Sequence, residues 1–251
     1  MMATSIESAL VIGGGSGVGR ATVLALAAAG TRVRAVGRQP APLERVRQDA
    51  SGPGAVSVSA LDATDGPAMD RLIRDVDPDL VVVSAGARAR LALVHEQSWE
   101  SFSEPWNTDV KMSFQIGQSA LRKPLRAGSR VILVSSGAGL GGSPLSGGYA
   151  GAKRTQMFLA SYLQRSADAA KLGIRFVAVV PKQLLIGTEL GTKAADAYAE
   201  LAGVTREKYM ERFPVPLGAD GVAQAILKIA QGEVAREGTI IGVTGAGIEV
   251  L

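Results

Sequence analysis

Short runs of apolar, mostly β-branched residues recur along the chain, separated by longer stretches of helical composition. The runs are almost continuously apolar rather than alternating, which is typical of parallel strands that are buried on both faces of a sheet. This pattern predicts seven strands, at Ala9 to Ile12, Thr31 to Val36, Ala55 to Val58, Leu80 to Val83, Arg130 to Val134, Arg175 to Val180 and Thr239 to Val243.

The segments between these runs are long enough for crossover helices, for example Ala21 to Ala29 and Ala150 to Ala170. The repeated strand–helix–strand order predicts an α/β fold, a doubly wound parallel sheet of about seven strands with helices on both faces. We expect one domain over residues 1–251. Ligands of such sheets bind beyond the carboxyl ends of the strands, so functional residues are sought directly after each strand.

One segment interrupts this rhythm. Residues 184–213, between the last two predicted strands, exceed the usual connection of about 2 to 6 residues. Gly203 is placed to end one helix, and Thr205 to cap a second one that Pro214 ends. We interpret this insertion as a candidate substrate lid.

Composition excludes several classes of function. The 251 residues include no cysteine, which rules out disulfides, thiolate metal sites and a cysteine nucleophile. The net charge of +4 comes from scattered basic residues with few aromatic residues between them, so we expect no nucleic-acid partner. Residues 1–7 lack the features of an export signal, and the apolar runs are too short to span a bilayer. We therefore expect a cytoplasmic protein without a membrane partner.

A glycine-rich loop, Gly-Gly-Gly-Ser-Gly-Val-Gly-Arg at residues 13–20, follows the first predicted strand. Glycines permit a tight turn and close approach of the backbone to a pyrophosphate, and the N-terminus of the following helix favours an anion. The alternative is a glycine-rich turn without a ligand, which the position between a strand and a helix makes less favourable.

The second predicted strand ends at Gly37-Arg38, where NAD sites usually carry an acidic residue. A guanidinium at this position can hold a 2′-phosphate, so NADP(H) is preferred over NAD(H); the alternative is a solvated arginine. Asp62 could accept from the adenine amine or could simply cap a turn. Ala85 and Gly86 are small residues at a position where the backbone could approach the cofactor closely. The alternative is that they are small because they form an ordinary turn.

Tyr149 and Lys153 are four residues apart in a segment of helical composition, so their side chains share one face. A phenol is a weak acid at neutral pH, and a neighbouring ammonium stabilises its ionised form. Ser136, after the fifth strand, could hydrogen-bond a substrate oxygen. Each residue alone has a structural interpretation, but together with the glycine loop they favour general acid–base chemistry at a carbonyl or alcohol.

With these motifs the chain resembles the short-chain dehydrogenase/reductase family over essentially its whole length. The resemblance rests on Gly13, Gly17, Gly19, Arg38, Asp62, Ala85-Gly86, Ser136, Tyr149 with Lys153, and Pro181. It implies a Rossmann-like fold in which Tyr149 is the acid/base, Ser136 orients the carbonyl, and Lys153 binds the nicotinamide ribose and tunes Tyr149. The expected cofactor contacts are Gly13, Ser16, Gly17, Val18, Gly19, Arg38, Asp62, Ala63, Ala85, Gly86, Tyr149, Lys153, Pro181 and Thr188.

The chain departs from the family pattern at Asp109, where the family usually has an asparagine that completes a catalytic tetrad. A carboxylate there could pair with Lys153, raising the pKa of the lysine and partly neutralising its field at Tyr149. If the family's proton relay uses the main-chain carbonyl of this residue, aspartate is tolerated. We keep Asp109 as a candidate catalytic residue.

Three further positions depart from the pattern. Lys182 stands where the family has a glycine after Pro181, Thr188 lies seven rather than five residues beyond that proline, and Val83-Ser84 replaces two asparagines. His95, the only histidine, is expected to be structural or solvated. Trp99 and Trp106 are expected to pack or to form a subunit interface.

These features predict an NADP(H)-dependent oxidoreductase that acts on a ketone or secondary alcohol, with a small molecule as its partner. The alternative is a non-catalytic NADP(H)-binding regulatory or scaffold protein, which Asp109 and Lys182 motivate. The resemblance also implies a homodimer or homotetramer formed through helices near Asp109 and Tyr149.

Overall fold

The computed structural model describes residues 6–88, 90–234 and 240–251, and its centre is an eight-stranded sheet. The strand order is β3-β2-β1-β4-β5-β6-β9-β10. Seven strands are parallel and β10 alone runs antiparallel to its neighbour. The bounds are β1 Ser8–Ile12, β2 Arg32–Gly37, β3 Val56–Ala60, β4 Leu80–Val83, β5 Arg130–Val134, β6 Arg175–Pro181, β9 Ile240–Thr244 and β10 Gly247–Val250.

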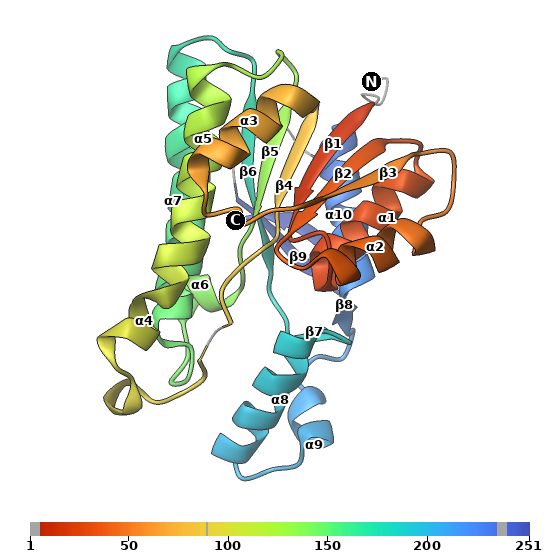
Figure 1. Ribbon diagram of the computed structural model, residues 1–251. Coiled ribbons are helices and arrows are strands. Elements are labelled where there is room, and N and C mark those ends of the chain that lie inside the picture. Colours follow the sequence, from red (N-terminus) through yellow and green to blue (C-terminus); the bar gives the residue numbers. More distant parts are fainter. Residues whose placement is uncertain (1–5, 89, 235–239) are drawn as a thin grey trace.

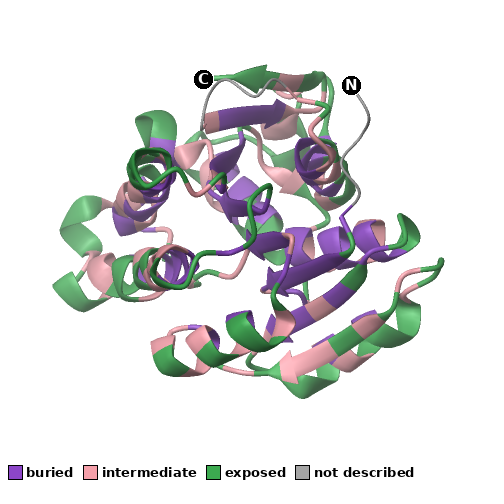
Figure 2. Ribbon diagram, turned by 90° about the horizontal axis from the view of Figure 1, so that it is seen from above, coloured by how far each residue is buried: buried purple, intermediate pink, exposed green. Residues whose placement is uncertain are grey.

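Helices cover both faces of this sheet, as Figures 1 and 2 show. Helices α1 (Gly17–Ala28), α2 (Pro40–Asp49) and α10 (Ala219–Gln231) pack on one face. Helices α3 (Gly66–Val76), α5 (Lys111–Arg122) and α7 (Gly147–Ala169) pack on the other. Each face has its own apolar cluster, and alternate residues of the central strands point into one cluster or the other. This is why the strands are apolar at every position rather than at every second one.

The Rossmann-like α/β fold is therefore confirmed. The predicted bounds of β4 and β5 agree with the structure, and the other predicted strands begin or end within two residues of the observed ones. The first residue of the seventh predicted strand, Thr239, lies outside the described residues. The eighth strand was missed because β10 contains only four residues, mostly exposed, after a tight turn. Within the described ranges no helix is both long and apolar enough to cross a membrane.

The predicted insertion contains two helices, α8 (Glu189–Leu201) and α9 (Arg206–Met210), which project beyond the carboxyl edge of the sheet (Figure 1). Two short parallel strands, β7 (Leu185–Ile186) and β8 (Leu217–Gly218), join the points where the chain enters and leaves it. The hydroxyl of Thr205 accepts from the main-chain N–H of Lys208 at 3.2 Å, so Thr205 caps the second helix as predicted. Gly203 follows the end of α8 with φ +65°, a conformation that favours glycine.

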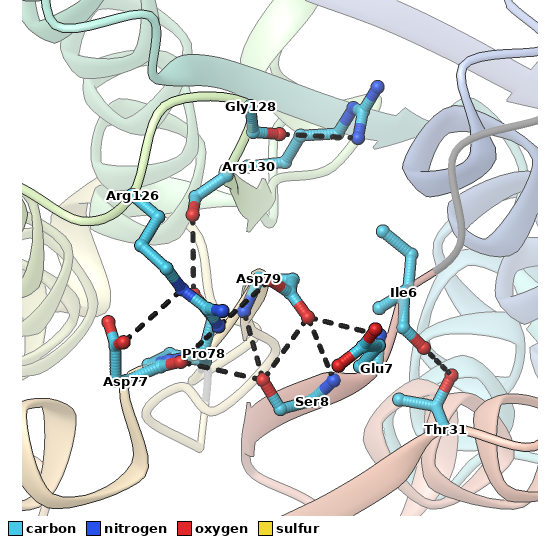
Figure 3. Close-up of polar contacts among 11 residues, drawn as sticks. Ile6, Glu7, Ser8, Thr31, Asp77, Pro78, Asp79, Arg126, Gly128 and Arg130 are labelled. Carbon is cyan, nitrogen blue, oxygen red and sulfur yellow. Dashed lines mark hydrogen bonds and ion pairs between the residues drawn. The ribbon is translucent and has the colours of Figure 1, made fainter.

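The amino edge of the sheet is held by Asp79, just before β4 (Figure 3). Its Oδ2 accepts from the main-chain N–H groups of Glu7 and Ser8 at 3.0 Å each, which attaches the start of β1. Its Oδ1 forms an ion pair of 2.9 Å with Arg126 in the segment before β5. One carboxylate therefore connects the starts of three neighbouring strands at the edge away from the predicted cofactor site.

We expect Asp79→Ala to lower the free energy of unfolding by about 1–3 kcal/mol, because two N–H groups lose their acceptor. Urea denaturation measures this change. The control is Asp49→Ala, which removes an exposed ion pair with Arg20 and should cost less than about 1 kcal/mol. Equal losses in both variants would contradict the role of Asp79, and cofactor affinity should change in neither.

Candidate active site

Three segments meet at the carboxyl edge of the sheet. Ser136 lies directly after β5, Tyr149 and Lys153 lie on the first turns of α7, and Asp109 lies in a π-helical turn, Trp106–Val110. This turn joins α4 (Trp99–Pro105) to α5 and packs against α7. The structure thus brings the predicted catalytic residues into one region.

Lys153 is buried, with its side chain 7% exposed. Its Nζ forms an ion pair with Asp109 Oδ2 at 3.0 Å and donates to the main-chain oxygen of Val134 at 3.2 Å and to Gln156 Oε1 at 3.0 Å. Nζ also lies 5.4 Å from the centroid of the Tyr149 ring. Sequence reasoning proposed the contacts with Asp109 and Tyr149 but missed Gln156, which lies on the same helix face three residues further on.

Two opposing effects set the charge of this lysine. Burial lowers the pKa of Lys153, whereas the Asp109 carboxylate and Tyr149 raise it, and the net result is a pKa above the ordinary value of 10.5. Lys153 is therefore an ammonium at neutral pH, as the sequence analysis expected for a lysine paired with Asp109.

Asp109 is completely buried and connects two parts of the site. Its Oδ1 accepts from the main-chain N–H of Ala87 at 2.7 Å, in the segment after β4. Its main-chain oxygen accepts from the Ser113 hydroxyl at 2.7 Å. Its Oδ2 has the ion pair with Lys153 but no hydrogen bond of good geometry from any described group. The carboxylate thus holds the loop after β4 and the lysine of α7 together.

Ser136 is half-buried, and its oxygen accepts from the main-chain N–H of Ala138 at 3.2 Å. This bond closes a turn at the end of β5, which is the structural interpretation of Ser136. The hydroxyl proton remains free to point at a substrate oxygen. The neighbouring Ser135, which sequence reasoning missed, donates to the main-chain oxygen of Lys153 at 2.7 Å. That bond ties the end of β5 to the helix turn that carries Lys153.

The glycine loop leaves no room for a side chain at Gly13 or Gly19. A Cβ at Gly13 would lie 2.5 Å from the main-chain nitrogen of Ala85, and one at Gly19 would lie 2.0 Å from the oxygen of Gly13. Ser16 precedes α1 in an extended conformation, and its side chain forms no capping bond within the described helix. The first turn of α1 carries no acidic residue. The buried residues Val18 and Gly19 anchor this turn, which offers free N–H groups at a positive helix end.

The remaining predicted cofactor contacts surround this loop. Arg38 is exposed just beyond β2, and Asp62 and Ala63 follow β3. Hydrogen bonds to the carboxylate from the main chain and hydroxyl of Thr64, helped by the charge of Arg38, hold the pKa of Asp62 below its ordinary value. One oxygen of Asp62 therefore has the turn-capping role that the sequence left open.

Ala85, Gly86, Pro181 and Thr188 also lie at this edge. Ala85 continues from β4 with its N–H bonded to Ile12, and Pro181 ends β6. A Cβ at Gly86 would lie 2.8 Å from Asp109 Oδ2. Thr188 lies against the glycine loop, 3.9 Å from a Cβ built on Gly17, but its hydroxyl caps α8. Its cofactor contact stays a prediction.

The insertion reaches the loop before α7 through Tyr198 of α8. Its hydroxyl forms a hydrogen bond with Ser143, in the loop between α6 (Ala138–Gly141) and α7, and its ring stacks on Tyr209 of α9 at 5.9 Å. Burial raises the pKa of Tyr198, and the nearby Tyr149 adds to this effect. Sequence reasoning did not foresee this polar contact of Tyr198.

The single histidine and the two tryptophans lie outside this cluster. His95 is exposed on a short 3-10 turn, Val94–Glu96. Trp99 is 73% exposed and stacks on Phe102, and Trp106 is 39% exposed in the π-helical turn. These positions agree with a solvated histidine, and they leave the interface role of the tryptophans a prediction.

Comparison with known proteins agrees with this arrangement. The family model for short chain dehydrogenase matches residues 7–198. The chain is 35% identical over 127 residues to L-xylulose reductase of Mesocricetus auratus, a match that covers 51% of each protein. An uncharacterised short-chain type dehydrogenase/reductase of Sinorhizobium fredii is 29% identical over 193 residues and 75% of each chain. The chain spans about half the length of the L-xylulose and carbonyl reductases it matches.

Solved structures share the fold over almost the whole chain. A short-chain type dehydrogenase/reductase from Mycobacterium ulcerans superimposes with a TM-score of 0.80 at 25% identity, covering 97% of this chain and 92% of that one. Sorbitol-6-phosphate 2-dehydrogenase from Erwinia amylovora has a TM-score of 0.78 at 25% identity, covering 94% and 98%. Because the family model also covers most of the sequence, including Ser136, Tyr149 and Lys153, this chain belongs to the short-chain dehydrogenase/reductase family.

Proposed function

We propose that this protein is an NADP(H)-dependent oxidoreductase that transfers hydride between the nicotinamide and a ketone or secondary alcohol. The observation that carries the proposal is the buried ammonium of Lys153, 5.4 Å from the ring centroid of the half-buried Tyr149 at the carboxyl edge of the sheet. An ammonium in this position stabilises negative charge that develops on the tyrosine oxygen during proton transfer.

The glycine loop supports a dinucleotide at this edge. Its backbone excludes side chains at Gly13 and Gly19, and α1 presents its N-terminus without an acidic residue. Such a terminus suits a pyrophosphate. Arg38 would hold a 2′-phosphate, and the turn at Asp62 would adjoin the adenine. When bound, the nicotinamide supplies or accepts the hydride.

The chain's own residues carry the proton chemistry. In reduction, the Tyr149 hydroxyl donates its proton to the carbonyl oxygen as the carbonyl carbon receives hydride, which yields the alcohol. The Ser136 hydroxyl donates a hydrogen bond to the same oxygen and stabilises its developing charge. Lys153 remains charged throughout. In oxidation each proton moves in the opposite direction.

We expect Tyr149→Phe to lower kcat/KM for NADPH-dependent reduction by about 10²- to 10⁴-fold, the usual contribution of a general acid. The assay follows NADPH consumption with a panel of ketoses, diketones and β-ketoacyl thioesters. Tyr162→Phe is the matched control, since Tyr162 lies 49% exposed on the same helix. Turnover at the parent rate in Tyr149→Phe would refute the assignment of Tyr149 as the general acid.

Arg38→Asp tests the cofactor preference. The parent should bind NADP⁺ more tightly than NAD⁺, and the variant should lose about tenfold or more of its NADP⁺ affinity, since hydrogen bonds to charged groups contribute about 1.5–3 kcal/mol. Calorimetry measures both affinities, with Arg165→Asp, exposed on α7, as control. Equal affinities of the parent for NADP⁺ and NAD⁺ would refute the preference.

One observation supports a second function, non-catalytic binding of NADP(H) in a regulatory or scaffold role. The ammonium of Lys153 is paired with the Asp109 carboxylate at 3.0 Å. This counter-charge partly neutralises the field of Lys153 at Tyr149, which would weaken the role of the lysine in turnover. This function predicts a calorimetric signal with NADPH, no consumption of NADPH with any carbonyl, and binding unaffected by Tyr149→Phe.

We expect Asp109→Asn to lower the free energy of unfolding by about 3–5 kcal/mol near neutral pH, because it leaves a buried ammonium without its counter-charge. The pKa of Lys153 is raised above 10.5 in the folded protein, so the pair contributes fully below pH 10.5 and its contribution is lost at higher pH. The difference between parent and variant should therefore shrink above pH 10.5.

Denaturant titrations at several pH values measure this difference. The control is Asp196→Asn, which removes an exposed pair with Arg206 and should cost less than about 1 kcal/mol. A difference between parent and Asp109→Asn that grows above pH 10.5 would contradict the pairing.

A further inference from the structure

The two residues that follow Pro181 are both held by the hairpin of β9 and β10. Lys182 stands where the family resemblance predicts a glycine, and its α-carbon lies 2.9 Å from a Cβ built on Gly137, beside Ser136. Its main-chain N–H donates to Val243 at 2.9 Å. The backbone at this position therefore touches both the catalytic serine loop and β9.

The Lys182 side chain runs across β9 to β10. Its Nζ pairs with Glu249 Oε1 at 2.6 Å, and a Cβ on Gly242 would lie 3.1 Å from Lys182 Cδ and 3.0 Å from Glu249 Cγ. A glycine in β9 thus provides the space in which the two long side chains meet. Lys182, which replaces the glycine of the family pattern, is therefore paired with β10, the strand that the sequence did not predict.

Gln183 connects three segments that are distant in sequence. Its Nε2 donates to the main-chain oxygen of Val215 at 3.0 Å, where the chain leaves the insertion, and its Oε1 accepts from the N–H of Gly245 at 2.7 Å, in the β9–β10 turn. A Cβ at Gly245 would lie 2.2 Å from the Val215 oxygen, so the turn and the exit segment are in direct contact.

These contacts lie at the base of the insertion. Directly beyond Gln183, β7 pairs with β8 through Leu185 and Leu217, and this short pairing joins the entry of the insertion to its exit. At the far end, Tyr198 bonds Ser143 next to the catalytic helix. The position of α8 beside the loop before α7 therefore depends on how its base is fixed.

We propose that Gln183 is a positioning residue that fastens both ends of the insertion to the β9–β10 hairpin and so holds α8 over the substrate position. This role rests on the proposed function for its effect on substrate, but its structural part is independent of turnover. A residue of this kind sets how tightly substrate is enclosed and does not take part in proton transfer. Its loss should raise KM and leave kcat nearly unchanged.

The test compares Gln183→Met, which keeps the length and removes both hydrogen bonds, with Gln183→Glu, which keeps the acceptor for Gly245 and removes the donor to Val215. Limited trypsin digestion reports opening, because α8, α9 and the residues after α9 carry Lys193, Arg206, Lys208 and Arg212. Gln48→Met is the control, since Gln48 is exposed on α2 and its side chain makes one long hydrogen bond, to Glu44.

We expect cleavage within residues 193–212 to be about tenfold faster in Gln183→Met, because tenfold corresponds to about 1.4 kcal/mol, which is within the range for two lost hydrogen bonds. Gln183→Glu should show about a threefold increase, and Gln48→Met none. KM for the carbonyl substrate should rise severalfold in Gln183→Met, with kcat and the Kd of NADPH within about twofold of the parent.

Parent-like cleavage of Gln183→Met would overturn the proposal. So would cleavage spread over the whole chain with a matching loss of unfolding free energy, since that is a general loss of stability. Faster local cleavage with an unchanged KM would overturn the link to substrate. Because digestion needs no turnover, its result stands even where the carbonyl assay fails, which separates this proposal from the proposed function.

Discussion

The common direction of seven strands determines where everything else in this molecule lies. Parallel neighbours require a crossover that returns over one face of the sheet, so all carboxyl ends share one edge and all amino ends share the other. The two edges have different roles. Asp79 closes the amino edge with bonds to main-chain groups, whereas Ser136, the glycine loop and the insertion gather at the carboxyl edge.

Within the carboxyl edge, the requirements of one buried lysine organise the neighbouring loops. An ammonium without water needs a counter-charge and acceptors for its protons. Asp109, Gln156 and the main chain of Val134 provide them, and they come from the π-helical turn, from α7 and from β5. Since Asp109 also accepts from Ala87, the lysine indirectly fixes the loop after β4. Asp109 therefore supplies both the counter-charge of the lysine and a bond to the loop after β4.

Local patterns were enough to predict most of the fold. The apolar runs at β4 and β5 have the bounds that the structure shows, because strands buried on both faces are almost continuously apolar. Thr205 caps α9 because its side chain satisfies a main-chain N–H at the helix start. The strand β10 and the role of Gln183 could not be predicted in this way. The four residues of β10 are mostly exposed and show no apolar pattern, although they pair with the neighbouring β9. The role of Gln183 depends on contacts with residues 32 and 62 positions away, which a single glutamine does not reveal. The same limit applies to Ser135, whose bond to Lys153 follows only from how α7 docks on β5.

The close approach of Gly86 to Asp109 constrains how this site can change over generations. A methyl group at position 86 would lie 2.8 Å from one carboxylate oxygen and 3.1 Å from the other, inside van der Waals contact. A lineage that gains a side chain at position 86 while aspartate stands at 109 must first pass through a crowded intermediate. If position 109 first changes to a smaller residue, a side chain at position 86 no longer meets this carboxylate. Substitution at position 109 before position 86 is therefore easier than the reverse order.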